Sequence, residues 1–418
     1  MIDMTALFTE QIDKRGSDLH LKIGRPPLIR IAGEITPTDK PPLTEADLLD
    51  AIKFVLSPQA FARLQQEGEF DSAYTVPNLA RFRINVFRRM GQYGLIARAI
   101  PLKAPTFDKM TMPPVLKDLL NVPQGMILVT GPTGSGKSTT LSCMIEQLNQ
   151  AQSLHIVTIE DPIEFVYTDA KCEINQRQLG TDVSSLSEAL RRVLRQDPDV
   201  ILLGEMRDRE TIEMAMHAAE TGHLVFSTLH TNDAKQTIDR IIDVFPADAR
   251  DHIRSMLSLT LHAIVSQRLV RRAGGTGRVA AMEILINTPN IRELIAGNRM
   301  RDIENAMKTG AFYRMQTFNQ ALAKLVQDNL ITLEEAEKTS ANPNELKMIV
   351  RGILSGGGAI QQPSPPDAPA KPAAAATPTG SASTLLGKGA APTPSTTPGS
   401  ATPAADQTKG GLKITRGY

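Results

Sequence analysis

One eight-residue segment limits the possible folds of this 418-residue chain more than any other part of the sequence. Residues 131–138 match the pattern G-x-x-x-x-G-K-[S/T] in full, with an apolar run before them at 126–129 and a helical apolar pattern after them at 141–148. A strand that enters a glycine-rich loop and leaves it as a helix directs backbone N–H groups and a helix N-terminus toward phosphate. The segment therefore predicts a phosphate-binding loop in an α/β domain.

The residue types of this loop have distinct expected roles. The glycines let backbone amides approach phosphate oxygens, Lys137 reaches the β- and γ-phosphates, and Ser138 holds Mg²⁺. An ordinary helix after a glycine-rich turn is the alternative, which the flanking patterns disfavour. The predicted nucleotide-binding residues of the loop are Gly131, Pro132, Thr133, Gly134, Ser135, Gly136, Lys137, Ser138 and Thr139.

Acidic residues follow two other apolar runs. Glu205 comes directly after the run 200–203, where a parallel strand would deliver a carboxylate beside the phosphate loop. We expect Glu205 to organise Mg²⁺ and water. Three acids, including Glu160 and Glu164, follow the run 156–159, and one of them is expected to orient or deprotonate the attacking water.

Two histidines lie on either side of the apolar run 224–227. Either His223 or His230 can donate a hydrogen bond to a γ-phosphate. Alternatively, both are buried or turn histidines with ordinary hydrogen-bond partners. Spacing alone leaves both interpretations open.

Arginines alternate with apolar residues in one N-terminal segment. Arg81 and Arg83 therefore share one face of a predicted strand, and no acid occurs between Ser72 and Phe107. Such a strand can face solvent, bind nucleic acid or reach a neighbouring subunit's nucleotide. The chain has no Trp and 46 basic against 45 acidic residues. This composition disfavours nucleic acid as a partner and favours a solvated face.

Changes in pattern along the chain predict five segments. Residues 1–100 resemble a small α+β domain, and prolines mark a linker at 101–122. Residues 123–288 alternate apolar runs with helical patterns, as in a parallel sheet with crossover helices. Residues 289–355 read as helices, and residues 356–418 are a tail rich in Pro, Ala, Thr, Ser and Gly that is expected to be disordered.

The number of cysteines, the length of the apolar runs and the first residues indicate the cellular location. The chain has two cysteines, Cys143 and Cys172, too few for a disulfide scaffold or a tetracysteine zinc site. Its apolar runs fall short of the roughly 18–20 residues that span a bilayer, and its first residues lack a signal-peptide pattern. We therefore expect a cytoplasmic protein without a transmembrane segment.

Four motifs in order resemble those of the type II/IV secretion ATPases. They are the phosphate loop, the acidic box at 158–165, the Gly-Glu-Met-Arg-Asp turn at 204–208 and the histidine box at 221–234. Within this family the chain is similar to the ATPases that retract type IV pili. The resemblance covers nearly all of residues 1–354 and omits the tail.

The resemblance implies a PAS-like N-terminal domain, a RecA-like ATPase domain and a homohexameric ring that binds ATP and Mg²⁺ between the two domains. It makes Glu205 the Walker B residue and Glu164 the general base. It does not fix which arginine contacts the γ-phosphate. The catalytic residues implied are Lys137, Glu164, Glu205, His230, Arg81, Arg83 and Arg98, with Glu160 and His223 beside the nucleotide.

The implied function is an ATP-hydrolysing motor at the inner-membrane base of a pilus machine. It would contact a membrane platform protein and drive the pilus disassembly that underlies twitching motility. One departure is the segment 290–295, Asn-Ile-Arg-Glu-Leu-Ile, where retraction ATPases carry Ala-Ile-Arg-Asn-Leu-Ile. Its apolar stripe, Ile291, Leu294 and Ile295, is the expected carrier of coupling to the membrane partner.

Other functions stay open at this point. The departure at 290–295 leaves room for the accessory retraction paralogue. Extension and type II secretion ATPases fit less well, because they usually have a longer N-terminal region and often a tetracysteine zinc module. A nucleic-acid motor on a RecA-like core and a non-hydrolysing regulatory subunit are alternatives from other classes.

Overall fold

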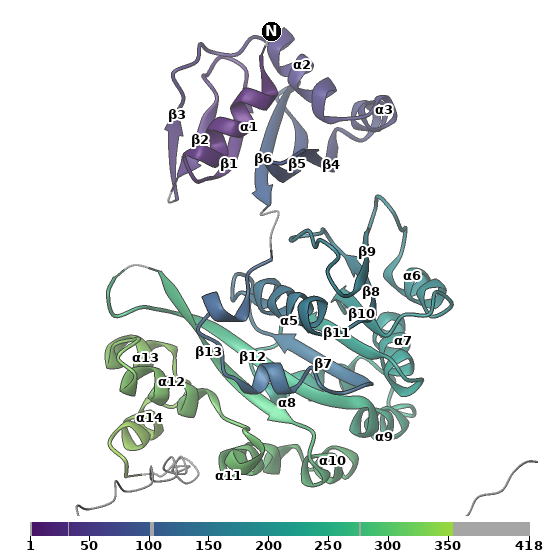
Figure 1. The fold of residues 1–418 in the computed structure, drawn as a ribbon, viewed down its shortest axis with the longest axis vertical. Coiled ribbons are helices and arrows are strands. Elements are labelled where there is room, and N and C mark those ends of the chain that lie inside the picture. Colours follow the sequence, from purple (N-terminus) through teal and green to yellow (C-terminus); the bar gives the residue numbers. More distant parts are fainter. Residues whose placement is uncertain (1, 32, 101–103, 276, 354–418) are drawn as a thin grey trace, which may run out of the picture. The chain divides into compact units, whose positions relative to one another are not determined.

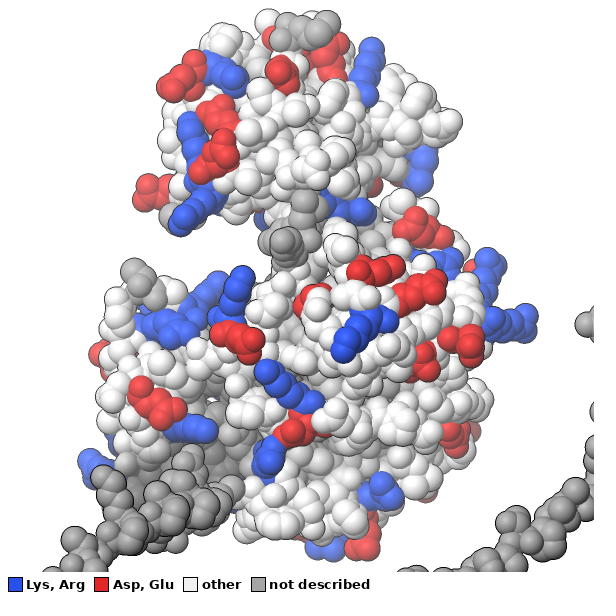
Figure 2. Space-filling model, viewed as in Figure 1, with Lys and Arg blue, Asp and Glu red and all other residues white. Residues whose placement is uncertain are grey.

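The computed structural model describes residues 2–31, 33–100, 104–275 and 277–353 (Figure 1). The predicted tail, residues 356–418, lies outside the described residues. Two sheets organise the described chain, one on each side of the stretch 101–103, and each is described by itself. On the face drawn in Figure 2, basic and acidic side chains are interspersed over both parts, in keeping with their nearly equal numbers.

The first sheet has six antiparallel strands in the order β3-β2-β1-β6-β5-β4. Its strong alternation is clearest in β5, where Phe82, Ile84 and Val86 are fully buried and the residues between them are half-buried or exposed. The buried face packs against three helices to form one core. The elements are α1 (Met4–Asp13), β1 (Gly16–Lys22), β2 (Leu28–Ile31), β3 (Glu34–Pro37), α2 (Glu45–Val55), α3 (Pro58–Glu67), β4 (Glu69–Val76), β5 (Ala80–Arg89) and β6 (Gln92–Ile100).

The second sheet has seven strands in the order β13-β12-β7-β11-β10-β8-β9. All neighbours are parallel except the hairpin β12·β13. Parallel strands covered on both faces carry nearly continuous apolar runs, and every residue of β7 is buried. The strands are β7 (Gly125–Thr130), β8 (His155–Glu160), β9 (Glu173–Gln178), β10 (Val200–Glu205), β11 (Leu224–Leu229), β12 (Leu261–Arg271) and β13 (Arg278–Ile286).

Helices cover both faces of this sheet and form two cores. On one face lie η1 (Phe107–Lys109), α4 (Val115–Asp118) and α5 (Lys137–Ala151). On the other lie α6 (Leu186–Val193), α7 (Arg209–Glu220), α8 (Ala234–Asp243) and α9 (Arg250–Thr260). Aspartate N-caps start α7 and α8, since the side chains of Asp208 and Asp233 accept hydrogen bonds from first-turn amides.

Part of the segment expected as a linker contributes to this core. Phe107, Val115, Leu116 and Leu120 are buried among the residues of α5 and the sheet. The prolines of this segment break regular helices and strands, but apolar side chains between them still pack. The positions of the prolines therefore do not indicate that the segment from Phe107 onward packs into the core of the second sheet.

The remaining helices divide between two cores. The residues of α10 (Pro289–Ala296), η2 (Met300–Asp302) and α11 (Ile303–Thr309) extend the core on the α6–α9 face. A smaller core forms between the hairpin β12·β13 and the last helices. The elements that complete the described chain are η3 (Gly310–Tyr313), α12 (Phe318–Gln327), α13 (Leu333–Thr339) and α14 (Pro343–Val350).

The apolar stripe of α10, which is expected to carry coupling, does not face outward. Ile291 and Ile295 are fully buried and Leu294 is 3% exposed, because α10 packs on the core of the second sheet. The exposed residues of this helix include Arg292 and Glu293. The stripe stabilises the fold, so any contact of α10 with a partner is left to its polar face.

No helix among the described residues is long and apolar enough to cross a membrane.

Candidate active site

The candidate site lies at the edge of the second sheet where β7, β8, β10 and β11 end. Because these strands are parallel, their following loops meet there. The loops line a cavity of about 580 Å³ that contains most of the phosphate loop together with Glu160, Glu164, Glu205 and His230. The structure thus brings together residues that the sequence predicted from four separate motifs.

The backbone of the phosphate loop requires glycine at two positions. Gly131 has a φ of 141° and Gly136 a φ of 91°, and a Cβ at Gly131 would lie 2.4 Å from the carbonyl oxygen of Gln267. Gln267 on β12 also holds the loop, because its Nε2 donates to the carbonyl oxygen of Ser135 at 2.6 Å and its Oε1 accepts from Thr140 at 2.8 Å. The loop is therefore pinned to the neighbouring strand.

The side chain of Lys137 folds back onto the loop that precedes it. Its Nζ donates to the carbonyl oxygens of Gly131 at 2.9 Å and Pro132 at 3.3 Å. Burial lowers the pKa of Lys137, and the negative charges of Glu205 and Glu164 oppose that decrease. The ammonium group thus lies beside the loop carbonyls in a field made by two carboxylates.

Glu205 and His230 form a pair beside the loop. His230 Nε2 lies 3.0 Å from Glu205 Oε2, and its Nδ1 lies 3.5 Å from the hydroxyl of Thr133. Arg207 donates to the same carboxylate oxygen at 2.8 Å. Burial alone would raise the pKa of Glu205, but the hydrogen bond from Arg207 and the charge of His230 outweigh it and lower the pKa. The carboxylate is therefore ionised at neutral pH.

The acids at and just after the end of β8 occupy two different environments. Glu160 accepts hydrogen bonds from Thr158 at 2.7 Å and from Gln176 at 3.2 Å. Burial raises the pKa of Glu160 despite these bonds. Glu164 is exposed and lines the same cavity. Of the two, Glu164 is the more accessible to a water molecule, and Glu160 is fixed in place.

His223 does not reach this site within one chain, contrary to its expected place beside the nucleotide. It precedes β11, at the opposite edge of the sheet, and the strand's six residues span roughly 20 Å. Its Nδ1 lies 2.9 Å from the carbonyl oxygen of Ala218, at the end of α7. The motif brackets β11 with two histidines, and the strand holds them at opposite ends.

The three arginines expected at the γ-phosphate belong to the outer face of the N-terminal sheet. Arg83 on β5 lies opposite Arg98 on β6, and Arg98 Nε donates to Asp18 at 2.7 Å. Asp18 is only 4% exposed. Burial alone would raise its pKa, but hydrogen bonds from Ser17 and Arg98 lower it. Arg98 thus has a buried partner, whereas Arg83 lies 3.8 Å from exposed Asp71. Arg81 and Arg83 share the face that alternation predicted.

Two residues at the site, one bonded to the phosphate loop and one lining the cavity, were missed in the sequence. Gln267 pins the loop, and Arg278, at the start of β13, lines the cavity. Both come from the hairpin β12·β13, more than 120 residues after the loop. No local motif marks them, because only the sheet order brings β12 beside β7.

The site fits a nucleotide and Mg²⁺. Ser135 Oγ is buried and has no hydrogen-bond partner in the described part of the chain, and the two glycines leave backbone amides accessible to phosphate oxygens. Mg²⁺ is usually bound by one or two protein oxygens together with substrate phosphates. Ser138 and Glu205 supply such oxygens at the same cavity.

Comparisons with known proteins agree with this site. A family model described as type II/IV secretion system protein matches residues 2–353. The type IV pilus retraction ATPase PilT of Pseudomonas aeruginosa is 46% identical over 342 residues, which cover 82% of this chain and 99% of that protein. The type IV pilus ATPase PilU of the same organism is 37% identical over 350 residues, covering 84% and 92%.

A solved structure extends the comparison to the fold. The crystal structure of the pilus retraction motor PilT with bound ADP has a TM-score of 0.78 at 45% identity, covering 83% of this chain and 99% of that one. The expected α/β architecture is confirmed, as is the resemblance inferred from the four motifs. The chain belongs to the type II/IV secretion system protein family.

Proposed function

We propose that this protein is an ATPase motor that drives the retraction of type IV pili. The observation that carries the ATPase assignment is the meeting of the phosphate loop, Glu205 and His230 in one cavity. The retraction assignment rests on 46% identity to PilT over nearly the whole of that relative, against 37% to PilU. Identity over that length favours retraction over the accessory paralogue.

The residues of the cavity divide the chemistry of hydrolysis. The loop amides and Lys137 bind the phosphates and compensate the charge that develops as the γ-phosphoryl group leaves. Glu164 accepts the proton of the attacking water, and Glu160 is a fixed neighbour of that water. His230 connects the Glu205 carboxylate with the loop, so that it detects whether a γ-phosphate is present.

Mg²⁺ would be held by Ser138 and Glu205 and would supply charge neutralisation to the phosphates. The ionised state of Glu205 suits this role, because its lowered pKa keeps a negative charge at the site. Glu205 is thereby better suited to hold a cation than to act as the base.

The working form is proposed to be a homohexamer in which arginines of the N-terminal sheet serve a nucleotide. Arg81 and Arg83 are the better candidates, since Arg98 is held by buried Asp18 at 2.7 Å, whereas Arg83 lies 3.8 Å from exposed Asp71. A subunit carrying Arg83→Ala should be inactive alone and regain activity in rings mixed with Lys137→Ala subunits, because some interfaces then contain an intact composite site. Mixed rings that stay inactive would assign Arg83 to its own chain.

The proposed domain plan is 1–100, 101–122, 123–288, 289–355 and 356–418, in which the residues from Phe107 onward pack on the core of the second sheet. The motor is proposed to be cytoplasmic and to dock on a platform protein of the inner membrane. The platform protein is proposed to contact the exposed polar residues of α10, including Arg292 and Glu293. Replacing both with oppositely charged residues should stop retraction and leave ATP turnover unchanged.

A cellular experiment tests the direction of the motor. Cells that lack the protein should carry many pili that no longer retract, and twitching should stop. Bald cells would assign the protein to pilus extension, and retraction at reduced force would assign it to the accessory role. Stimulation of the purified protein's ATPase activity by DNA or RNA would instead favour a nucleic-acid motor.

A further inference from the structure

Two further cavities lie beside the nucleotide site, along the edge of the sheet. A second cavity, of about 370 Å³, shares Asp161, Glu205 and Arg207 with the nucleotide cavity. A third, of about 330 Å³, shares Ser184 and Ser185 with the second. The side of the nucleotide site that holds Glu205 is thereby adjacent, through shared wall residues, to a series of cavities that ends between β9 and α6.

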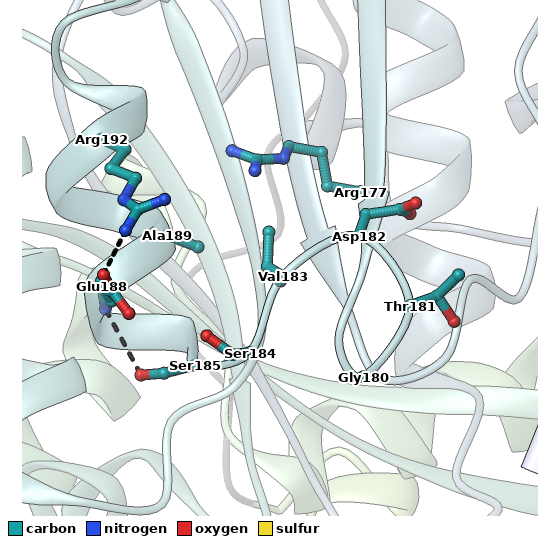
Figure 3. Close-up of a pocket in the computed structure, with 10 residues that line it drawn as sticks. All are labelled: Arg177, Gly180, Thr181, Asp182, Val183, Ser184, Ser185, Glu188, Ala189 and Arg192. Atoms are coloured by element: carbon teal, nitrogen blue, oxygen red, sulfur yellow. Dashed lines mark hydrogen bonds and ion pairs between the residues drawn. The ribbon is translucent and has the colours of Figure 1, made fainter. Parts of the chain in front are cut away.

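The third cavity has two arginines on opposite walls. In Figure 3, Arg177 of β9 and Arg192 of α6 point their guanidinium groups toward each other across the cavity. Nη1 of Arg177 is buried and has no hydrogen-bond partner, and no acid forms an ion pair with Arg177 among the described residues. Arg192 is bound to Glu188 on its own helix. Arg177 therefore brings an uncompensated positive charge to this space.

Nearby acids do not neutralise Arg177. The carboxylate of Asp182 points away from the cavity in Figure 3 and accepts a hydrogen bond from the Gln178 amide at 2.7 Å. In the second cavity, Glu205 is paired with Arg207, and Glu210 is paired with Arg191 at 2.8 Å. Along this path Arg207 is thus paired with Glu205, whereas no acid forms an ion pair with Arg177 among the described residues.

A partly buried guanidinium without a partner is costly, and its planar set of donors suits an anion with several oxygens. The hydroxyls of Ser184 and Ser185 line the same cavity and add neutral donors. Inorganic phosphate fits this donor set in size, charge and number of acceptor oxygens. The proposed ATPase reaction produces it at the connected cavity.

We propose that Arg177 and Arg192 form a binding site for the phosphate released by hydrolysis, reached from the nucleotide cavity past Arg207. This inference rests on the proposed ATPase function. Phosphate leaves along the sheet edge while ADP stays on the loop, so the two products depart by different routes. Inorganic phosphate should then inhibit turnover without competing with ATP.

The first test measures binding of radiolabelled inorganic phosphate to the full-length protein saturated with ADP. Arg177→Gln and Arg192→Gln should each weaken phosphate binding at least tenfold, and Arg177→Lys should restore part of it. The matched control is Arg63→Gln, which removes an arginine from an exposed pair with Glu67 on α3 and should bind phosphate as the parent does. Equal phosphate binding by all variants would overturn the proposal.

The second test follows turnover. In stopped flow with a fluorescent phosphate sensor, Arg177→Gln should release phosphate several-fold more slowly, while the rate of ATP cleavage in quenched flow is unchanged. If cleavage proceeds and phosphate release is unaffected, this inference fails and the proposed function stands. If the parent protein cleaves no ATP, the proposed function fails, and the binding test still decides on the site.

Two other results with Arg177→Gln also decide on the phosphate site. Should Arg177→Gln fail to fold, Arg192→Gln tests the same cavity from an exposed helix position, where its side chain is 68% exposed. Should Arg177→Gln dissociate the oligomer and leave phosphate binding unchanged, a carboxylate of a second copy occupies the cavity, and the phosphate site is refuted.

Discussion

The two ends of strand β11 show how position in a parallel sheet decides what a side chain does. His230 follows the carboxyl end of β11, where its imidazole contacts Glu205 and the phosphate loop. His223 precedes the amino end, where its imidazole contacts the carbonyl oxygen of Ala218. The two histidines belong to one short motif, and six residues of strand place them in different chemical environments.

The amino edge contains polar residues of the same types as the carboxyl edge, with a different use. His155 Nδ1 lies 3.0 Å from the carbonyl oxygen of Asp197, and its backbone amide donates to Asp199 at 2.8 Å. These bonds satisfy strand ends and loops locally. At the carboxyl edge, the loops after four strands converge, so that polar groups from distant segments contact one another. The edge of the sheet at which a polar residue lies therefore indicates its function better than its residue type does.

The largest difference in ATP turnover is expected between two variants that each neutralise one acid, one at each edge of the sheet. Glu205→Gln should lower ATP turnover by at least ~100-fold, because it removes the charge that holds Mg²⁺. Nucleotide binding, measured by equilibrium fluorescence, should persist. Asp199→Asn at the amino edge should keep turnover within about threefold, since Asp199 bonds to the backbone of His155. Similar losses in both variants would show that the two edges do not differ in function.

The histidine pair should give a smaller difference. His230→Gln should lower steady-state turnover about tenfold or more, because one polar contact to the reacting region is typically worth that much. His223→Gln should stay within about twofold in the same assay and lose only local stability. A tenfold loss for His223→Gln in assembled rings would mean that the amino edge of one subunit serves the nucleotide of another, as the family resemblance allows.

Two amide side chains, one at each edge of the sheet, also differ in what they bond to. Gln267 bonds to the phosphate loop, while Asn287 donates to the carbonyl oxygens of Ser258 and Leu261 at the amino edge. Gln267→Leu should weaken ATP binding about three- to tenfold, because the loop loses its hydrogen bonds to β12. Asn287→Leu should lower the melting temperature and leave the ATP dissociation constant unchanged. Titration calorimetry and thermal unfolding distinguish the two.

The smallest effect on turnover is expected at Glu283, behind the carboxyl edge. Its carboxylate accepts from the amides of Ala234 and Phe318, at the first residues of α8 and α12, and burial raises its pKa to about 7. The folded state therefore keeps the proton that the unfolded state releases near pH 4.5. This contribution to stability is complete below pH 4.5 and is lost as pH rises to about 7.

The Gln variant isolates this contribution. Between pH 5 and 7.5, the free energy of unfolding of the parent should fall relative to that of Glu283→Gln by roughly 1–3 kcal/mol. Chemical denaturation at a series of pH values measures the difference, and ATP turnover at pH 7.5 should change less than twofold. A difference between the two proteins that does not vary with pH would contradict the raised pKa.

Much of the fold and the site followed from local sequence patterns. The phosphate loop, the placement of Glu205 at the end of β10 and the alternation around Arg81 and Arg83 were each determined within about ten residues. Such patterns reflect backbone geometry and burial, which act locally. The strand that separates His223 from His230 was also visible, yet both histidines were expected at the nucleotide.

Other features depended on packing between distant segments. The burial of Leu294 and of Leu116 could not be inferred, because an apolar stripe does not indicate which surface covers it. Gln267 and Arg278 enter the site only through the order of strands in the sheet. Sequence motifs therefore identified the groups that bind phosphate, and missed the groups that hold the loop in place.

Strand β12 carries a constraint on how this chain can evolve. Gln267 bonds to the phosphate loop, and the next residue, Arg268, turns to the other side, where it donates to the carbonyl oxygen of Thr339 and stacks on Phe318. Successive side chains of a strand point to opposite faces. Inserting or deleting one residue before this pair would exchange the two faces and break both contacts at once. Substituting one residue of the pair removes the contacts on one face only, whereas a change of length before the pair removes the contacts on both.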